Sequence, residues 1–239
     1  AKRARRRSSD HVASRFSRVD DDGRRRFVDD PPVLTRLVDA DRDRLDQLFT
    51  AYRATTSPDI SLLLSQYELT DLATRVVGVG SVGTRCSILL LTGPRGASLV
   101  LQVKEAQPSV LETWGGIDEA AARHQGERVV ANQRILQAVS DPFLGHLDIG
   151  GRDYYVRQFR DMKGSIEIAE LDPVQFRTYV AGCRRVLARG HVQSPDAPAI
   201  LGYIGRTDRI DEPFVDWAVA YADQSLADFE LVRDHQEAS

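Results

Sequence analysis

The sequence predicts an α+β fold in which an antiparallel β-sheet lobe with a glycine-rich loop is followed by a mainly helical part. Three observations lead to this prediction. Alternating side-chain character over residues 86–90 and 99–104 is typical of strands. A glycine segment, residues 78–83, precedes the first of these runs, and a turn sequence, 92–96, separates the two. Beyond residue 172 the spacing of apolar residues becomes helical.

Length and composition indicate a globular chain. The chain has 239 residues, of which 42% are hydrophobic and 28% charged, enough for one large domain or two small ones. Its longest strongly apolar run, 88–91, is far shorter than the roughly 20 residues of a membrane span. No N-terminal stretch has the pattern of a signal peptide. Cys86 and Cys183 are far apart, which argues against a disulfide scaffold and fits a reducing compartment. We therefore expect a cytoplasmic protein with no membrane partner.

Charge is distributed unevenly along the chain. The net charge is −3, yet residues 1–26 carry +6 and the remainder −9. The basic arm at 2–7 could contact nucleic acid or an acidic surface, but the acidic body favours a solvated arm, and we expect no nucleic-acid partner. Three of the 32 basic residues are lysine: Lys2, Lys104 and Lys163. Because arginine is the usual cation here, a lysine within an apolar strand suggests a specific role.

The chain divides into three predicted parts. Residues 1–70 form the basic arm and a helical lead-in, with helices expected over 41–53 and 58–67. Residues 71–160 form a β-rich, nucleotide-binding-like lobe, and 161–239 a helical part. Within the lobe, strands are expected at 75–77, 86–90, 99–104 and 154–159, and a helix at 126–139. In the helical part, Asp172-Pro173 and Pro213 are typical of helix starts, which predicts helices over 173–190 and 214–235.

The glycine segment is the sharpest motif, with the pattern G-x-G-x-x-G. Glycines let backbone amides approach a phosphate closely. In a dinucleotide-binding fold such a segment opens a helix, whereas in a protein kinase it joins two strands and a lysine lies on the third. Here a short β-like stretch follows the glycines, and Lys104 ends the strand after it. This favours a kinase-like lobe in which Lys104 holds the α and β phosphates of ATP. The residues expected to cover the phosphates are Gly78, Gly80, Ser81 and Gly83.

A kinase lysine is held by a carboxylate from the helix that follows it. Glu127 is the candidate, because it lies at helical spacing from three residues expected to face inward: Ala131, Ile135 and Ala138. An ordinary acid in a first helical turn, favoured by the helix dipole, is an equally good interpretation of Glu127. Other acids stay open for the same role: Glu105, Glu112 and Glu119.

Further candidates carry weaker signals. The strand over 154–159 would lead into the connection between lobes, where the backbone around Gln158 could contact an adenine ring. His191 and Asp196 are weak candidates for general acid–base catalysis, and a polar helix end is the better interpretation of both. The histidines offer no metal-ligand spacing. ATP and Mg²⁺ are therefore the cofactors that this interpretation implies.

Two other interpretations of the glycine segment stay open. Val76 to Gly78 could end the first strand of a dinucleotide-binding fold, with Glu105 at the spacing of a ribose-binding acid. The segment could also be a glycine turn without a ligand.

Several longer strings resemble the bacterial family catalogued as domain of unknown function 2252. They are VVGVGSVGTRC at 76–86, LQVKEA at 101–106, DYYVRQ at 153–158 and RDMKGS at 160–165, with shorter matches at 23–26, 29–32, 202–205 and 221–224. The resemblance covers nearly the whole chain. Two departures concern Gly190-His191 and Pro195-Asp196, where a more regular Ala-His and Gly-Asp would be expected. A third is Arg85, where a kinase glycine loop usually has valine.

The resemblance implies a kinase-like protein of which this chain is one part. Members of the family look like relatives of protein kinases and aminoglycoside phosphotransferases, and are usually longer. In them a Gly-Asp-x-His type loop and an Asp-rich strand precede the glycine loop and look like the catalytic base and metal ligands. This sequence contains neither that loop nor Asp-Phe-Gly. The resemblance thus implies the C-terminal half of a phosphotransferase, completed by the missing N-terminal half or by a partner protein. A non-catalytic, protein-binding scaffold is the alternative, and a dinucleotide-binding protein the second alternative.

Overall fold

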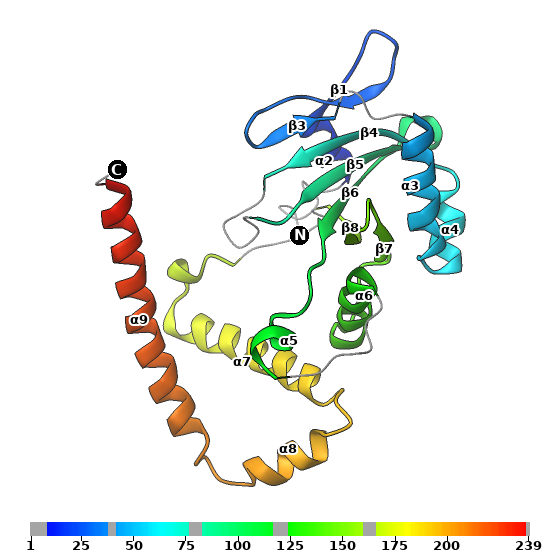
Figure 1. Cartoon of the computed structure of the whole chain (residues 1–239). Helices are drawn as coiled ribbons and strands as arrows, with labels where there is room; N and C mark the ends of the chain where they lie inside the picture. The colour runs from blue at the N-terminus through cyan, green and yellow to red at the C-terminus, as the bar shows by residue number, and fades with distance from the viewer. Residues whose placement is uncertain (1–8, 38–41, 77–82, 117–123, 160–165, 238–239) are drawn as a thin grey trace. The chain divides into compact units, whose positions relative to one another are not determined.

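A six-stranded antiparallel sheet is the centre of the first part of the chain (Figure 1). The strand order is β3-β4-β5-β6-β8-β7, and every neighbouring pair is antiparallel. The strands are β3 (Leu34–Arg36), β4 (Glu68–Arg75), β5 (Cys86–Thr92), β6 (Ser98–Glu105), β7 (Gly145–Asp148) and β8 (Asp153–Gln158). The expected α+β class with an antiparallel sheet is confirmed.

The computed structural model describes residues 9–37, 42–76, 83–116, 124–159 and 166–237. The chain divides into two compact units, Ala1–Tyr179 and Val180–Ser239. The sheet and the helices that pack on it belong to the first unit.

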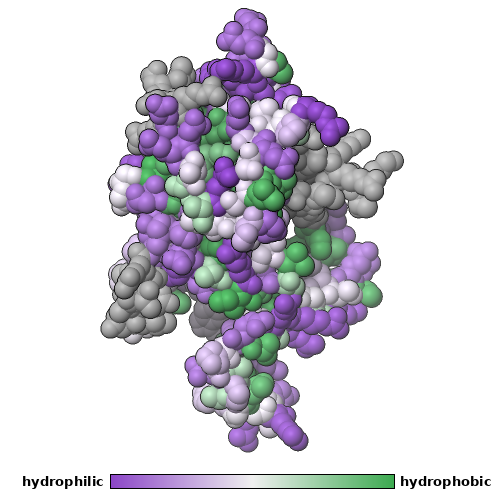
Figure 2. All heavy atoms as spheres, turned by 90° about the vertical axis from the view of Figure 1, so that its right-hand side faces the viewer, coloured by the Kyte–Doolittle hydropathy of each residue, from purple (hydrophilic) through white to green (hydrophobic). Residues whose placement is uncertain are grey.

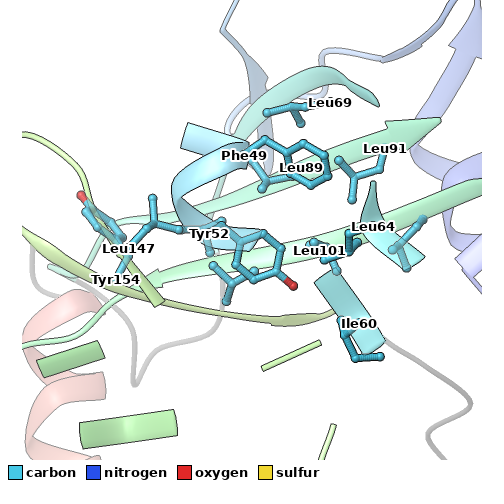
Figure 3. Close-up of a cluster of buried hydrophobic side chains, with 13 residues drawn as sticks. Phe49, Tyr52, Ile60, Leu64, Leu69, Leu89, Leu91, Leu101, Leu147 and Tyr154 are labelled. Atoms are coloured by element: carbon cyan, nitrogen blue, oxygen red, sulfur yellow. The ribbon is translucent and has the colours of Figure 1, made fainter. Parts of the chain in front are cut away.

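Helices α3 (Arg42–Ala54) and α4 (Pro58–Leu64) cover one face of the sheet. Their apolar side chains Phe49, Tyr52 and Leu64 pack with Leu101 of β6 and its neighbours in a buried cluster (Figure 3). The Tyr52 hydroxyl donates a hydrogen bond to the carbonyl of Phe143 at 2.7 Å. Burial raises the pKa of Tyr52, so its hydroxyl stays protonated and keeps this bond. The polar atom of the largest buried side chain is thereby satisfied.

The opposite face carries a second buried cluster. Ile88, Leu90 and Val100 have no exposed surface, and Phe159 joins them at the end of β8. Two elements that precede the sheet in the sequence cover them, α2 (Ser9–Phe16) and β2 (Arg25–Phe27), and Leu34 of the edge strand β3 joins the same cluster. Strand β1 (Ser17–Val19) pairs with β2 in a separate hairpin. Lys104 lies on this second face, because it alternates along β6 with the buried Leu101 and Val103 of the first cluster.

The remaining elements of the first unit lie between or after the strands. Helix α6 (Gln125–Leu136) packs on β7 and β8. The others are the short helix α5 (Val110–Trp114) and the 3₁₀ turns η2 (Pro94–Gly96) and η3 (Ile168–Glu170).

The residues before 71 contain more β structure than the sequence predicts. They form β1, β2 and β3 besides the two expected helices, and the predicted boundary at residue 70 falls inside β4. The hydrophobic pattern hides β4 because its buried positions after a bulge are Asp71, Ala73 and Arg75, two of which are charged. The short elements β7, α5 and α8 were also not expected from the sequence. The lead-in therefore contributes to the same sheet as the lobe.

The C-terminal helices follow the sequence pattern closely. Helix α7 (Pro173–His191) runs into the second unit, which also holds α8 (Ala197–Ile204) and α9 (Asp211–Glu237). Asp172 caps α7 by accepting hydrogen bonds from the backbone of Val174 and Gln175. Every side chain described in α9 is exposed. On the face of the molecule that Figure 2 shows, apolar side chains lie at the surface among polar ones. Among the described residues, no helix has the length and apolar character needed to cross a membrane.

Candidate functional site

A row of polar side chains crosses the sheet at the end nearest the glycine segment. Lys104 of β6 lies opposite Cys86 of β5 and Tyr155 of β8. Tyr155 in turn lies opposite His146 of β7. Arg75 ends β4 just beyond the last β4–β5 pair, so it lies beside Cys86. Because cross-strand partners project from the same face, these residues form one row, named the polar row: Arg75, Cys86, Lys104, Tyr155 and His146.

Gln102 and Arg157 lie behind the polar row, one step further along the same face. They are cross-strand partners on β6 and β8. Arg157 Nε donates to Gln102 Oε1 at 3.0 Å, and Gln102 Nε2 donates to the Cys86 sulfur at 3.4 Å. Gln102 is 4% exposed. A buried amide is therefore held at both ends, which fixes its orientation beside Lys104.

The electrostatics of this face are positive around Cys86. Burial raises the pKa of the Cys86 thiol, while its hydrogen bond with Gln102 and the charges of Lys104, Arg75 and Arg157 lower the pKa and offset part of that rise. The positive charges of Lys104, Arg75 and Arg157 therefore all act on the Cys86 thiol. None of the side chains in the polar row, or in the Gln102–Arg157 pair behind it, is a carboxylate. This arrangement suits an anionic ligand.

Arg75 is buried between two aromatic rings. Its guanidinium carbon lies 5.0 Å from the centre of the Phe16 ring and 4.7 Å from that of Phe159. The centres of the two rings are 6.1 Å apart, and their planes are inclined at 66°. Cation–π attraction stabilises a guanidinium in such a position. The slot between α2 and the end of β8 is thus filled by a side chain of the protein itself.

The first turn of α6 is fixed to the other end of the polar row. His124 caps the helix, with Nδ1 accepting from the Glu127 backbone N–H at 3.2 Å. Its Nε2 lies 3.5 Å from Asp153 Oδ1, and the other Asp153 oxygen accepts from the Gln125 backbone N–H. The His124 and His146 rings are 4.5 Å apart. Helix α6 is therefore held at its start by β7 and β8.

The predicted phosphate-covering residues are described only in part. Gly78, Gly80 and Ser81 lie outside the described residues. Gly83 has a φ of +85°, a conformation that glycine adopts easily and other residues rarely. The chain then enters β5, so a strand and not a helix follows the last glycine. Lys104 is half-buried on β6, as its predicted position in a strand requires.

Glu127 lies in the first turn of α6, but the inward stripe predicted for this helix is wrong. The buried residues of α6 are Gly126 and Val130, whereas Glu127 and Ile135 are exposed. The carboxylate of Glu127 acts on His146, whose pKa it raises. No contact described for Glu127 reaches Lys104. The helix is rotated from the predicted orientation because glycine, which has no apolar side chain, makes the closest contact with the sheet.

The other acids considered for the Lys104 role have partners of their own where the structure describes them. Glu105 accepts from Arg152 Nη1 at 3.0 Å and from the Arg85 backbone N–H at 3.1 Å. Glu112 closes the capping box of α5 with Ser109. Glu119 lies outside the described residues.

Gln158 is not brought together with Lys104. It is paired with Leu101, so its side chain belongs to the face that α3 and α4 cover. Its backbone N–H donates to Asp141 Oδ2 at 2.6 Å. The predicted contact between this backbone and an adenine would therefore have to replace the Asp141 hydrogen bond.

His191 and Asp196 belong to the second unit. His191 is the last residue of α7 and Asp196 precedes α8, and both are exposed. In the described structure no hydrogen bond joins the two side chains. The hydrogen bonds described for Asp196 are made by its backbone, whose N–H donates to Ser194 Oγ at 3.2 Å and whose carbonyl accepts from the Ile200 N–H at 3.0 Å. This placement matches the interpretation of both as polar residues at helix ends.

Sequence reasoning missed the contributions of Arg75, Arg157 and His146 to this face. Strand alternation identifies Gln102 as a neighbour of Lys104, but cross-strand register decides which residues of other strands join them. A groove of about 720 Å³ lies at the opposite end of β4 and β5, and its lining includes none of the predicted site residues. Within the described ranges, no three histidine, cysteine or acidic side chains are grouped to hold a metal ion.

The match to a family model decides the family. A model described as an uncharacterized protein conserved in bacteria (DUF2252) matches residues 1–235. The chain belongs to the DUF2252 family. This match confirms the resemblance noted in the sequence. The matched residues include the polar row of this DUF2252 chain and the strands that position the row. No curated protein and no solved structure matched the chain.

His146 is expected to make the stability of this DUF2252 chain depend on pH. Burial lowers the pKa of His146, and the charges of His124 and Arg134 add to this effect. Glu127 and Asp153 oppose it. Because the unfolded chain binds the proton more readily, this stability is present above the unfolded pKa of about 6.5 and is lost as the pH falls through the lowered folded value.

Thermal unfolding measured between pH 7.5 and 5 tests this expectation. The midpoint should fall with pH more steeply in the wild type than in His146→Gln, which cannot take up the proton. Equal slopes in the two proteins would contradict the role of His146.

Proposed function

We propose that the chain is the nucleotide-binding module of a kinase-like phosphotransferase, in which Lys104 holds the phosphates of ATP. The observation that supports this most is the position of Lys104. It lies on the third of three consecutive antiparallel strands, β4, β5 and β6, and the glycine segment joins the first two. Protein kinases use the same sequence of parts, with the glycine loop before the second strand and the lysine on the third.

The elements after β6 also fit this proposal. Helix α6 follows β6 after the short helix α5, and in a kinase a carboxylate-bearing helix follows the lysine strand. Two further strands then join the sheet, and β8 lies directly beside β6. Glu127 keeps its proposed role of holding Lys104 on the condition that ligand binding turns α6 or draws the two side chains together.

The charges of the site support a phosphate ligand. Arg75, Lys104 and Arg157 bring three cations to one face of the sheet, where phosphate oxygens would be stabilised. ATP would supply the phosphoryl group for transfer, and Mg²⁺ would bind with the triphosphate, because the polar row provides no carboxylate ligands for it. We propose that the proton acceptor and the metal ligands come from another polypeptide segment, either an N-terminal half or a partner protein.

A non-catalytic scaffold that binds another protein is the second candidate. Exposed aromatic residues on α9 favour it, since Trp217 and Tyr221 stack at 5.2 Å with 63% and 59% of their surfaces exposed. Aromatic side chains of this kind are frequent anchors of protein interfaces. The dinucleotide-binding alternative has less support, because β4 and β5 are antiparallel neighbours and the fold it requires has a helix after the last glycine.

Thermal unfolding of the purified chain with Mg-ATP, and separately with NADH, tests the proposal. At a concentration one hundred times its Kd, ATP should add about 2.7 kcal/mol and raise the midpoint by roughly 5 to 10 °C. We expect this rise with ATP and none with NADH. Lys104→Ala should remain folded without ligand and lose the rise with ATP.

The matched control is Arg24→Ala, which removes an exposed cation from the β1–β2 hairpin and should keep the full rise with ATP. A rise with ATP that persists in Lys104→Ala would overturn the proposal. No rise with either ligand would favour the scaffold, and a rise with NADH alone would favour the dinucleotide-binding alternative.

A further inference from the structure

The apolar part of the face that carries Lys104 is already covered. Ile88, Leu90 and Val100 are completely buried, and Ala13 and Phe27 pack over them. Helix α2 makes many of its contacts with β6. A purine ring binds to a protein largely through apolar contact with its flat faces. In the described part of this face, the apolar side chains are occupied by the protein's own core.

The surface next to Lys104 is polar where a kinase is apolar. In the kinase pattern V-A-I-K, an alanine stands two residues before the lysine. Here that residue is Gln102, and Arg157 lies beside it. A base placed on this surface would have to displace the Arg157–Gln102 hydrogen bond or lie against it, leaving a buried amide or guanidinium without its partner.

The aromatic slot at the edge of the same face is filled as well. Phe16 and Phe159 contact each other edge to face, with their planes inclined at 66°, and the guanidinium of Arg75 lies 5.0 and 4.7 Å from their ring centres. Arg75 is 9% exposed, so the slot is nearly closed to solvent. Stacking between a base and these rings would require Arg75 to leave.

What this face offers to a ligand is therefore positive charge. We infer that the site binds the polyphosphate chain and makes no specific contact with the base. Nucleoside triphosphates with different bases and inorganic tripolyphosphate therefore bind about equally well. This inference rests on the proposed function, because it concerns the same Lys104 site. It broadens the ligand class from ATP to any compound with a triphosphate group, and it assigns Gln102 as the residue that keeps a base from binding next to Lys104.

Calorimetric titration of the full chain with Mg-ATP, Mg-GTP and Mg-tripolyphosphate tests the inference. We expect the three Kd values to agree within about threefold, which corresponds to less than 1 kcal/mol. Adenosine in excess should not weaken ATP binding. ATP that binds more than tenfold tighter than tripolyphosphate would overturn the inference and leave the proposed function intact. If none of the three binds, both fail.

Two variants show whether the binding occurs at this site. Lys104→Ala should abolish the binding of all three ligands. Tripolyphosphate that still binds to Lys104→Ala would be held elsewhere, for example by the arginine-rich arm at residues 2–7, and would count against the inference. Gln102→Ala restores the alanine of the kinase pattern and should shift the preference toward ATP over tripolyphosphate by threefold or more. An unchanged ratio in a folded Gln102→Ala protein would contradict the role assigned to Gln102.

Discussion

Gly126→Ala is expected to destabilise the first unit by about 2 to 3 kcal/mol, the cost of overpacking a close contact. Gly126 lies in the first turn of α6 and is buried against β8. A Cβ atom at this position would lie 2.2 Å from the carbonyl oxygen of Tyr154 and 2.7 Å from its carbonyl carbon. Backbone atoms of a central strand cannot rotate away as a side chain can. The helix would have to move, weakening the bond between the Gln125 backbone and Asp153.

Alanine normally favours a helix over glycine by about 1 kcal/mol, so the sign of the effect is diagnostic. Gly182→Ala in α7 is the matched control, because a Cβ there meets no atom within 4 Å. We expect Gly182→Ala to raise the unfolding midpoint slightly and Gly126→Ala to lower it by roughly 5 to 10 °C. A midpoint for Gly126→Ala at or above the wild-type value would mean that α6 does not pack on β8 as described.

Asp71→Ala is the second substitution with a large expected effect, about 3 kcal/mol of lost stability. Asp71 is 4% exposed and joins three strands. Its carboxylate accepts from the Phe27 backbone N–H of β2 at 2.8 Å and from Arg36 Nε of β3 at 2.9 and 3.1 Å. Without it, a buried N–H and a largely buried cation lose their acceptor, and removing one partner of such a pair costs more than the pair contributes.

Chemical denaturation compares Asp71→Ala with Asp71→Asn and with a surface control. Asp71→Asn keeps an acceptor oxygen and should fall between Asp71→Ala and the wild type. Asp234→Ala removes the partner of Arg233 in an exposed pair on α9 and should change stability little. Equal effects of Asp71→Ala and Asp234→Ala would contradict the role of Asp71 as the link between β2, β3 and β4.

The elements with a clear hydrophobic period were predictable, and those whose buried residues are charged were not. β5 and β6 alternate cleanly, and α7 and α9 start after capping or proline signals, so local sequence placed them well. β4 was misplaced because Asp71 and Arg75 occupy its buried positions. Those charges are tolerable because Asp71 pairs with Arg36 and Arg75 stacks on two rings. Such compensation comes from distant residues that no local pattern contains.

The candidate site was predictable in its centre and not in its surroundings. Composition and strand pattern singled out Lys104, and alternation placed Gln102 on the same face. The orientation of α6 was wrong because the residue in closest contact is Gly126, which carries no apolar signal. Arg75, Arg157 and His146 required the cross-strand register of four strand pairs, which depends on the whole sheet.

The most direct test of the account is whether the Lys104 ammonium group contacts a bound triphosphate. The chain has three lysines, Lys2, Lys104 and Lys163, so ¹³C labelling of the lysine side chains gives three ε-carbon signals, each assignable by replacement with arginine. On titration with Mg-ATP, the Lys104 signal should shift until the site is saturated, while Lys2, in the basic arm, stays in place. A Lys104 signal that remains unchanged while ATP binds, or while the Lys2 signal moves, would contradict the central claim.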